Sequence, residues 1–265
     1  MLKKSRPIVF YHKVGLTLSG GGTRGVAHIG VFKAFEEHGI KFDYVTGTSA
    51  GSILGALYSA NVPIDKMVEV AKSLTKKDLI NKRLMLGSDP KNIQQAVSRV
   101  LGDITFDQLS LPFAAVAVDI LTGNEVVLNT GSVCQAVAAS SAVPMLFKPV
   151  QIGDMALVDG GLLNNMPADV CRQMGAEVVI SVDLNHRRGK GITTGKLLDT
   201  VIATWNITTK STVYKGQINS DVIITPELSD YKNTRLESID EMIDEGYRAT
   251  ICKMDEIKEI LQTKF

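Results

Sequence analysis

Short apolar runs alternate with segments of helical periodicity along the chain, and this order predicts an α/β protein. The segments expected to form strands are 8–11, 14–18, 40–45, 113–120, 125–128, 150–152, 155–158, 178–184 and 222–226. The segments expected to form helices are 26–38, 52–60, 64–74, 90–101, 132–143, 167–174, 197–214 and 238–261, the last with a break near Gly246. Strands that alternate with helices favour a central, largely parallel sheet that carries helices on both faces.

The composition is that of an ordinary globular protein. Of the 265 residues, 45% are hydrophobic and 22% are charged, and the formal net charge is +1. Such a composition is typical of neither a disordered nor a membrane-spanning protein, and a net charge near zero argues against nucleic acid as a partner. Because the sequence contains no repeat, no low-complexity segment and no linker, we expect one domain over residues 1–265.

Cysteine usage and the N-terminal sequence indicate where the protein works. Cys134, Cys171 and Cys252 lie far apart and form no C-x-x-C pair, which argues against a disulfide framework and against a zinc site. Reduced thiols favour an intracellular protein. No long apolar run follows Met1–Pro7, so we expect neither a signal peptide nor a transmembrane helix. We therefore expect a cytoplasmic protein that meets any membrane lipid from the water side, at the inner face of the membrane.

The five residues Gly47-Thr48-Ser49-Ala50-Gly51 fit G-x-S-x-G, in which a serine lies on a tight turn between a strand and a helix. The predicted strand before the motif and the predicted helix after it provide that setting. Glycines leave room for the sharply turned backbone. The start of the helix offers free N–H groups and the positive end of the helix dipole, which stabilise developing negative charge. The motif makes Ser49 a candidate nucleophile, and a turn without chemistry is the alternative.

The glycine run before the first predicted helix permits two interpretations. Gly20, Gly22 and Gly25 match G-x-G-x-x-G, and Asp43 follows about 20 residues later, as in a dinucleotide-binding fold. This interpretation predicts an oxidoreductase that binds NAD(P)H at the glycines. The other interpretation predicts an oxyanion hole, in which successive N–H groups of the loop face one spot. We favour the second, because the apolar pattern continues past Asp43 into the turn that carries Ser49.

Two basic features have candidate roles at a lipid surface. Arg24, within the glycine run, is expected to brace that loop or to attract an anionic head group, and a surface salt bridge is the alternative. The stretch 72–86 mixes lysine and arginine with leucine, isoleucine and methionine. It is interpreted either as a solvated connection between helices or as a mobile flap that touches an anionic lipid surface.

A serine hydroxyl becomes a good nucleophile only when a base takes its proton. Ser49, Asp159 and His186 follow one another in the order of an α/β-hydrolase triad. Two features argue against that triad, because only two or three strands precede Ser49 and because His186 lies in a basic, polar loop. His28, on the first predicted helix, is expected to be packed there. The alternative base is Asp159 itself, at a strand end before two glycines that let another loop approach. A plain turn is the other interpretation of Asp-Gly-Gly.

Taken together, these stretches resemble the patatin-like phospholipase family. The matching elements are Gly20-Gly21-Gly22-Thr23-Arg24-Gly25, Val26-Ala27-His28-Ile29-Gly30-Val31, Gly47-Thr48-Ser49-Ala50-Gly51, Ala139-Ser140-Ser141-Ala142-Val143-Pro144 and Asp159-Gly160-Gly161. The resemblance extends from about residue 14 to residue 182, with a weaker match at 243–247. Each motif alone is loose, but the motifs together, in the family's order and spacing, are specific. Thr23 departs in a minor way, since an alanine is frequent there.

The resemblance implies a three-layer patatin-like fold with its core at about 14–182, followed by a C-terminal strand and helices over 196–265. It implies a lipid acyl hydrolase in which Ser49 is the nucleophile and Asp159 the proton acceptor. The implied oxyanion hole comprises Gly20, Gly21, Gly22 and Ala50. The implied supporting residues of the motifs are Arg24, Gly25, Gly47, Gly51 and Gly160.

No metal or other cofactor is expected, because no cluster of carboxylates, histidines or cysteines has the spacing of metal ligands. The expected partner is a lipid substrate, and the sequence leaves its head group, its acyl position, its chain length and the oligomeric state undetermined. A non-catalytic regulator with the same fold is a further alternative. An intact Ser49, Asp159 and glycine run argue against it.

Overall fold

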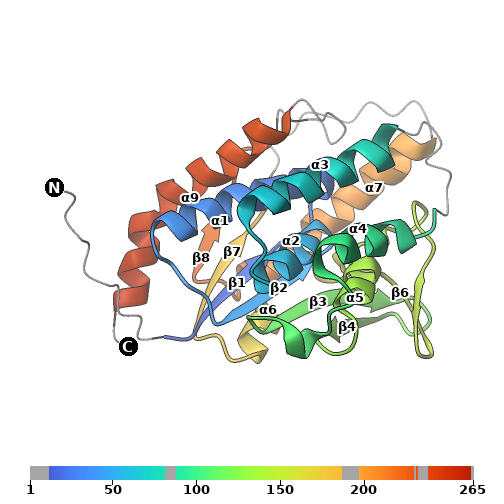
Figure 1. Ribbon diagram of the computed structural model, residues 1–265, viewed down its shortest axis with the longest axis horizontal. Coiled ribbons are helices and arrows are strands. Elements are labelled where there is room, and N and C mark those ends of the chain that lie inside the picture. The colour runs from blue at the N-terminus through green and yellow to red at the C-terminus, as the bar shows by residue number, and fades with distance from the viewer. Residues whose placement is uncertain (1–11, 81–87, 187–196, 230, 232–237, 264–265) are drawn as a thin grey trace.

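The computed structural model describes residues 12–80, 88–186, 197–229, 231 and 238–263, and its strands form one eight-stranded mixed sheet (Figure 1). The strands are β1 (Val14–Leu18), β2 (Tyr44–Thr48), β3 (Phe113–Asp119), β4 (Asn124–Leu128), β5 (Val150–Ile152), β6 (Met155–Asp159), β7 (Val178–Val182) and β8 (Val222–Ile224). The α-helices are α1 (Ala27–Glu37), α2 (Ala50–Ser59), α3 (Ile64–Ile80), α4 (Lys91–Leu101), α5 (Val133–Ser140), α6 (Ala168–Gln173), α7 (Leu197–Ser211), α8 (Tyr214–Gln217) and α9 (Ile239–Gln262). Short 3₁₀ helices are η1 (Gly22–Val26), η2 (Phe106–Gln108) and η3 (Gly160–Leu162).

The centre of the sheet is parallel and one side of it is antiparallel. The neighbouring strands β3, β2, β1, β7 and β8 run parallel, in that order. β4 and β6 pair with β3 in the antiparallel sense, and β5 pairs with β6 in the same way. β1, β3 and β7 are buried along their whole length, as expected for strands that helices cover on both faces. The predicted α/β fold class is therefore confirmed.

Alternate residues of β3 mark the two faces of the sheet. Phe113, Ala115 and Ala117 belong to the main hydrophobic core, together with residues of α1, α2, α5 and α9. Ala114 and Val116 point to the other face and pack with Val170 of α6. The sheet is therefore the middle of three layers.

The ends of β2 and β6 meet on one edge of β3. β2 pairs with the first half of β3, and its last pair is Thr48 opposite Val116. β6 pairs with the residues that follow, and its last pair is Asp159 opposite Ala117. β4 pairs across both stretches and therefore occupies the other edge of β3. Because β2 runs parallel to β3 and β6 runs antiparallel to it, the two strands approach each other head to head. Their last residues come together at the junction.

Some predicted boundaries are wrong. The strand predicted at 40–45 begins only at Tyr44, and the alternation before it reflects a loop in which Ile40 and Phe42 are buried. The helix predicted at 197–214 ends at Ser211, and α8 begins at Tyr214. α3 continues to Ile80, so the first part of the basic stretch 72–86 is helical. The rest of that stretch and the strand predicted at 8–11 lie outside the described residues.

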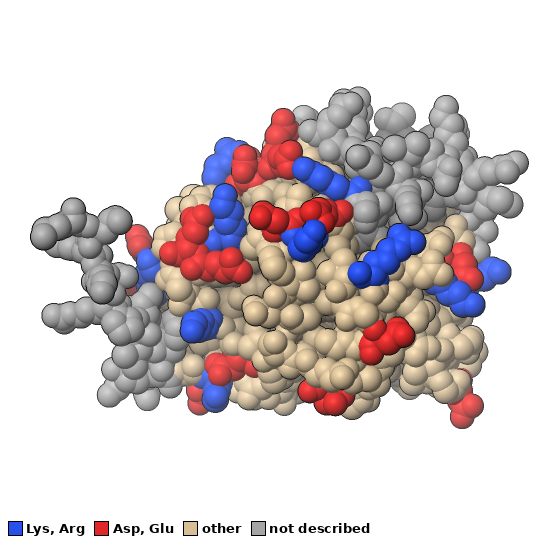
Figure 2. Space-filling model, viewed as in Figure 1, with Lys and Arg blue, Asp and Glu red and all other residues tan. Residues whose placement is uncertain are grey.

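The described surface carries charges of both signs. On the face shown in Figure 2, Lys and Arg side chains are interspersed with Asp and Glu. Lys66 pairs with Glu69 at 2.9 Å, and Lys72 on α3 pairs with Asp240 on α9 at 3.2 Å. Among the helices that the structure describes, none combines the length and the apolar character that crossing a bilayer requires.

The last helix is unbroken at Gly246, contrary to the prediction, because this glycine serves helix packing. α9 lies along α1 (Figure 1), and a Cβ atom added at Gly246 would overlap the carbonyl oxygen of Ala27. Gly30 on α1 makes the reciprocal approach to the carbonyl oxygen of Ile243. Each glycine thus lets the backbone of the other helix approach closely, which a larger side chain would prevent.

Gly246→Ala should therefore destabilise the protein by about 1–3 kcal/mol, although alanine favours helices by about 1 kcal/mol over glycine. The added methyl group forces α1 and α9 apart. Chemical denaturation would measure the change, with Asp255→Ala at an exposed position of the same helix as the control. A stabilised Gly246→Ala variant would contradict the packing role.

Candidate active site

Ser49 lies between the end of β2 and the start of α2, in a backbone conformation that is strained for a residue with a side chain. Its φ is 53° and its ψ is −124°. Neighbouring backbones approach closely, since a Cβ atom at Gly51 would overlap the carbonyl oxygen of Leu18, and one at Gly47 would overlap that of Gly51. Only glycine fits at these two positions. The predicted nucleophile elbow is thus present as a sharp, crowded strand-to-helix turn.

Hydrogen bonds hold the elbow to the sheet. The Ser49 N–H donates to Ser140 Oγ at 3.0 Å, and the Ser140 hydroxyl donates to the carbonyl oxygen of Val116 at 2.6 Å. The Ser52 hydroxyl donates to the carbonyl oxygen of Ser49 at 2.7 Å. Ser49 itself is half-buried, so its hydroxyl stands where a substrate can reach it.

Asp159 ends β6 at the head-to-head junction with β2 and is completely buried. Its Oδ1 accepts a hydrogen bond from the Gly161 N–H at 2.8 Å. Its Oδ2 is buried and has no hydrogen-bond partner among the described residues. A Cβ atom at Gly160 would overlap the carbonyl oxygen of Val116, so the glycine after Asp159 lets the loop turn against β3. The arrangement leaves one carboxylate oxygen without a donor.

Burial raises the pKa of Asp159 to about 7. The Ser49 side chain and the Gly161 N–H both favour the charged form and limit the rise. Ser49 is thus a neighbour of Asp159, although the geometry shows no hydrogen bond of normal length to Oδ2. Such bonds are often long before substrate binds. A buried carboxylate whose pKa lies near neutrality is suited to take up a proton.

The glycine loop packs directly against the elbow. A Cβ atom at Gly20 would lie 3.1 Å from the Cβ of Ser49, and one at Gly25 would lie 2.5 Å from the Cβ of Ala50. Gly22 has a φ of +58° and is exposed, and a Cβ atom there would contact nothing within 4 Å. The structure thus brings the glycine loop and the elbow together at the carboxyl ends of β1 and β2.

The prediction that Gly20 donates a hydrogen bond to the oxyanion is wrong. Its N–H donates to the backbone oxygen of Asn165 at 3.0 Å and is engaged inside the protein. Gly21 and Gly22 follow it in the loop, and Ala50 is the first residue of α2, whose N–H has no acceptor within its own helix. The expected donors are therefore Gly21, Gly22 and Ala50, and Gly20 contributes space beside Ser49.

Arg24 is only 3% exposed, so its guanidinium group lies inside the protein and not on the surface. Its Nε donates to the carbonyl oxygen of Gly21 at 3.3 Å, and a terminal N–H donates to Asn185 Oδ1 at 3.3 Å. Of the roles considered for Arg24, bracing the glycine loop is the one that its position fits.

Reasoning from single residues missed the side chains of Asn165 and Asn185. Asn185 Nδ2 donates to the carbonyl oxygen of Gly20 at 2.8 Å, and Asn165 Nδ2 reaches the same oxygen at 3.5 Å. Neither asparagine stands in a motif with a chemical signature, so no signal in the sequence marked it. Ser140 lay within a family-like segment, but its bond to the elbow was not foreseen.

Neither His186 nor His28 lies where the base of a catalytic triad would lie. His186 is exposed, and no hydrogen bond of the described residues joins it to Ser49 or Asp159. His28 is fully buried on α1, where one ring nitrogen, Nε2, bonds to the carbonyl oxygen of Ser19 at 3.0 Å. Burial lowers the pKa of His28 to about 4, so the ring is neutral near pH 7. His28 is thus a packed helix residue, as predicted.

Asp43 lies at the wrong end of the sheet for a dinucleotide site. It precedes β2, where its Oδ1 accepts from Lys13 Nζ at 3.0 Å and its Oδ2 from the Val14 N–H at 2.9 Å. The ribose-binding acid of that fold lies at the carboxyl end of the second strand, near the glycine turn. In this protein that end carries Ser49 instead.

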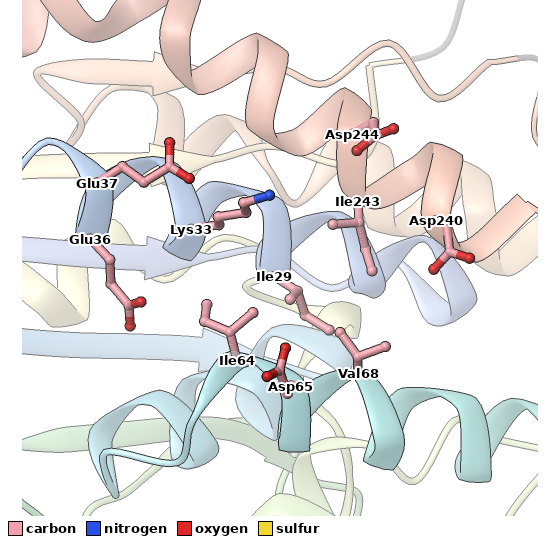
Figure 3. Close-up of a pocket in the computed structure, with 10 residues that line it drawn as sticks. All are labelled: Ile29, Lys33, Glu36, Glu37, Ile64, Asp65, Val68, Asp240, Ile243 and Asp244. Carbon is pink, nitrogen blue, oxygen red and sulfur yellow. The ribbon is translucent and has the colours of Figure 1, made fainter.

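A cavity of about 420 Å³ opens between α1, α3 and α9, but it is not the site described above (Figure 3). Isoleucine and valine side chains, Ile29, Ile64, Val68 and Ile243, point into it, and five acidic residues and Lys33 surround them. None of its lining residues belongs to the elbow, the glycine loop or the Asp159 loop. In the described part of the chain, no group of three His, Cys, Asp or Glu residues is placed to hold a metal ion.

Comparison with known proteins gives a consistent result. Residues 16–172 match the sequence profile of the family described as patatin-like phospholipase. An uncharacterised NTE family protein of Mycobacterium tuberculosis is 34% identical over 183 residues, which cover 65% of this chain and 49% of the relative. Patatin-like phospholipase domain-containing protein 6 of Mus musculus is 37% identical over 187 residues, or 66% of this chain and 14% of the relative. The chain thus spans about half the length, or less, of these relatives.

Solved structures show the same fold at low sequence identity. VipD from Legionella pneumophila superimposes with a TM-score of 0.65 at 14% identity, covering 92% of this chain and 67% of VipD. The type III effector protein ExoU gives a TM-score of 0.53 at 12% identity, covering 96% of this chain and 54% of ExoU. These likenesses support the three-layer architecture.

Asp159→Asn should stabilise the protein at pH 8. Because the pKa of Asp159 is higher in the folded state, the folded wild type loses stability as the pH rises from about 4 through about 7, by about 4 kcal/mol at most. The asparagine side chain is neutral at every pH, so the variant does not lose stability through ionisation at this position. Unfolding temperatures of variant and wild type should therefore differ at pH 8 and converge near pH 4. Asp154→Asn, at an exposed turn, is the control. Equal differences at both pH values would contradict the buried charge.

Proposed function

Since the chain belongs to the patatin-like phospholipase family, we propose that it is a serine acyl hydrolase that cleaves fatty-acyl esters of lipids. Ser49 is the nucleophile and Asp159 the proton acceptor. One observation carries the proposal. The strained Ser49 elbow and the buried Asp159, whose Oδ2 has no hydrogen-bond partner among the described residues, meet where β2 and β6 run head to head.

The reaction begins when Ser49 Oγ attacks the carbonyl carbon of the ester and Asp159 Oδ2 takes the hydroxyl proton. The tetrahedral oxyanion accepts hydrogen bonds from the N–H groups of Gly21, Gly22 and Ala50. Its collapse expels the alcohol, which receives the proton from Asp159, and leaves an acyl group on Ser49. Water then attacks the acyl-enzyme with Asp159 as the base, which releases the fatty acid and restores Ser49.

The substrates are (lyso)phospholipids or related acyl lipids, so the activity is of the phospholipase A or lysophospholipase type. The family match and the name of the mouse relative support this class. The enzyme works in the cytoplasm and meets the membrane transiently. The basic and apolar stretch 72–86, with its helical first part in α3, is the proposed contact.

Ser49→Ala and Asp159→Asn should each reduce ester turnover by at least about 10³-fold, because they remove the nucleophile and its base. His186→Ala should keep most of the activity. Turnover of a panel of acyl esters with varied head groups and chain lengths would measure these activities. The same panel would identify the preferred substrate. Ser59→Ala is the matched control, because it removes a buried hydroxyl on α2 that has no hydrogen-bond partner in the described part of the chain. If His186→Ala were as inactive as Ser49→Ala, a triad would replace the dyad.

The rate should also depend on pH through Asp159. Only the ionised carboxylate accepts a proton, so kcat/KM should rise with pH, with an apparent pKa near 7, and fall tenfold per unit well below it. A fluorophosphonate probe that labels Ser49 should show the same dependence. The His186→Ala variant shows whether the pH dependence comes from the Asp159 carboxylate or from the His186 imidazole. Loss of the acidic limb in that variant would assign the titration to His186.

A further inference from the structure

Side chains donate hydrogen bonds to two carbonyl oxygens of the glycine loop. The Gly20 carbonyl oxygen accepts from Asn185 Nδ2 at 2.8 Å and lies 3.5 Å from Asn165 Nδ2. The Gly21 carbonyl oxygen accepts from Arg24 Nε at 3.3 Å. Two successive peptide groups are therefore fixed through their oxygens.

A fixed carbonyl also fixes the next N–H, because a trans peptide is planar and its C=O and N–H point in opposite directions. The Gly20 oxygen faces the asparagines, so the Gly21 N–H must point away from them. In the same way the Arg24 contact turns the Gly22 N–H away from Arg24. Gly20 lies against Ser49, because a Cβ atom added at Gly20 would be 3.1 Å from the Cβ of Ser49. These peptide groups are therefore beside the nucleophile.

The donors in this arrangement are themselves held rigidly. Arg24 donates to Asn185 Oδ1, which fixes the amide of Asn185 so that its NH₂ group faces Gly20. The Asn165 backbone oxygen accepts from the Gly20 N–H. Asn165 and Asn185 are 1% and 7% exposed. Burying amides is costly unless they are hydrogen-bonded, so their presence here calls for a role that apolar residues would not fill.

We propose that Asn185 and Asn165 are positioning residues, which aim the Gly21 N–H at the oxyanion by holding the Gly20 carbonyl. The inference rests on the proposed function, since it assumes that Ser49 forms a tetrahedral oxyanion. It assigns to the segments after β7 and after η3 a part in a site whose reacting groups follow β1, β2 and β6.

Asn185→Asp tests the role most sharply. The carboxylate keeps the size of the side chain and the partner Arg24, but it has no N–H to donate to Gly20. We expect kcat to fall by about 10- to 100-fold with little change in KM, less than the about 10²–10³-fold that removal of a whole donor costs. Asn165→Asp should have a smaller effect in the same direction, since its contact is longer.

The accompanying readout is the affinity for a long-chain trifluoromethyl ketone. Ser49 Oγ adds to its carbonyl carbon, the C=O electron pair becomes an oxyanion, and the hydroxyl proton goes to Asp159. This inhibitor therefore reports oxyanion stabilisation, and its dissociation constant should rise by the same factor as kcat falls. Asn164→Ala is the matched control. Asn164 is equally buried and adjacent, but its amide bonds to Glu125 and Asp169 instead of the glycine loop.

Three results would overturn the proposal. One is an Asn185→Asp variant with wild-type kcat and inhibitor affinity. Another is a loss that follows only the fraction of folded protein, measured by thermal unfolding. A third is an equal loss of inhibitor affinity in Asn164→Ala. Failure of the proposed function is distinct, because wild-type protein would then hydrolyse no ester above the Ser49→Ala blank.

A measurement on the wild-type protein keeps the proposal testable even if the asparagine variants do not fold. In the trifluoromethyl ketone adduct, the amide proton of Gly21 should shift downfield as it bonds to the oxyanion. Heteronuclear NMR with ¹⁵N-glycine labelling would follow it, with the amide of Gly20 as the internal reference, since that N–H is already bonded to Asn165. An unmoved Gly21 signal would show that this N–H does not meet the oxyanion.

Discussion

The junction of β2 and β6 on β3 is the constraint from which the site follows. The pairs Thr48–Val116 and Asp159–Ala117 are consecutive along β3, so the register of two ladders sets how far apart Ser49 and Asp159 lie. Ser140 ties the same point together, because it bonds to both the Ser49 N–H and the Val116 carbonyl. A rigid sheet thereby positions two residues that are distant in the sequence, and the loops around them have little freedom to alter that spacing.

The same junction explains why the carboxylate of Asp159 is suited to take up a proton. Asp159 is completely buried, and among the described residues only one of its oxygens accepts a hydrogen bond. Such a group is costly to keep charged, and the cost is relieved whenever it takes up a proton. The strained serine backbone adds a second local cost beside it. Folding energy from the large common core of the sheet and helices compensates for both, which is typical of sites where chemistry takes place.

Much of the fold, and the residues that form the candidate site, could be predicted from the sequence, because those signals are local. Alternation of strands and helices, the turn around Ser49 and the glycine run all depend on neighbouring residues. What sequence did not reveal depends on distant partners. The role of Asn165 and Asn185 is visible only from their contacts with Gly20. The buried loop at Ile40 and Phe42 has the alternating pattern of a strand. Gly246 suggested a helix break because its packing partner on α1 could not be known from the sequence. The assignment of Gly20 as a donor failed for the same reason.

The close contact of Gly246 with Ala27 has a consequence for biosynthesis. α1 begins directly after the glycine loop, and its outer side is completed by α9, which is made from the last part of this chain. As the polypeptide leaves the ribosome, the elbow, the carboxylate and the glycines emerge long before the segment that clamps α1 in place. The nascent chain therefore carries the Ser49 elbow, Asp159 and the glycine loop before α9 can pack on α1, so the candidate site gains its full support only after translation has passed residue 246.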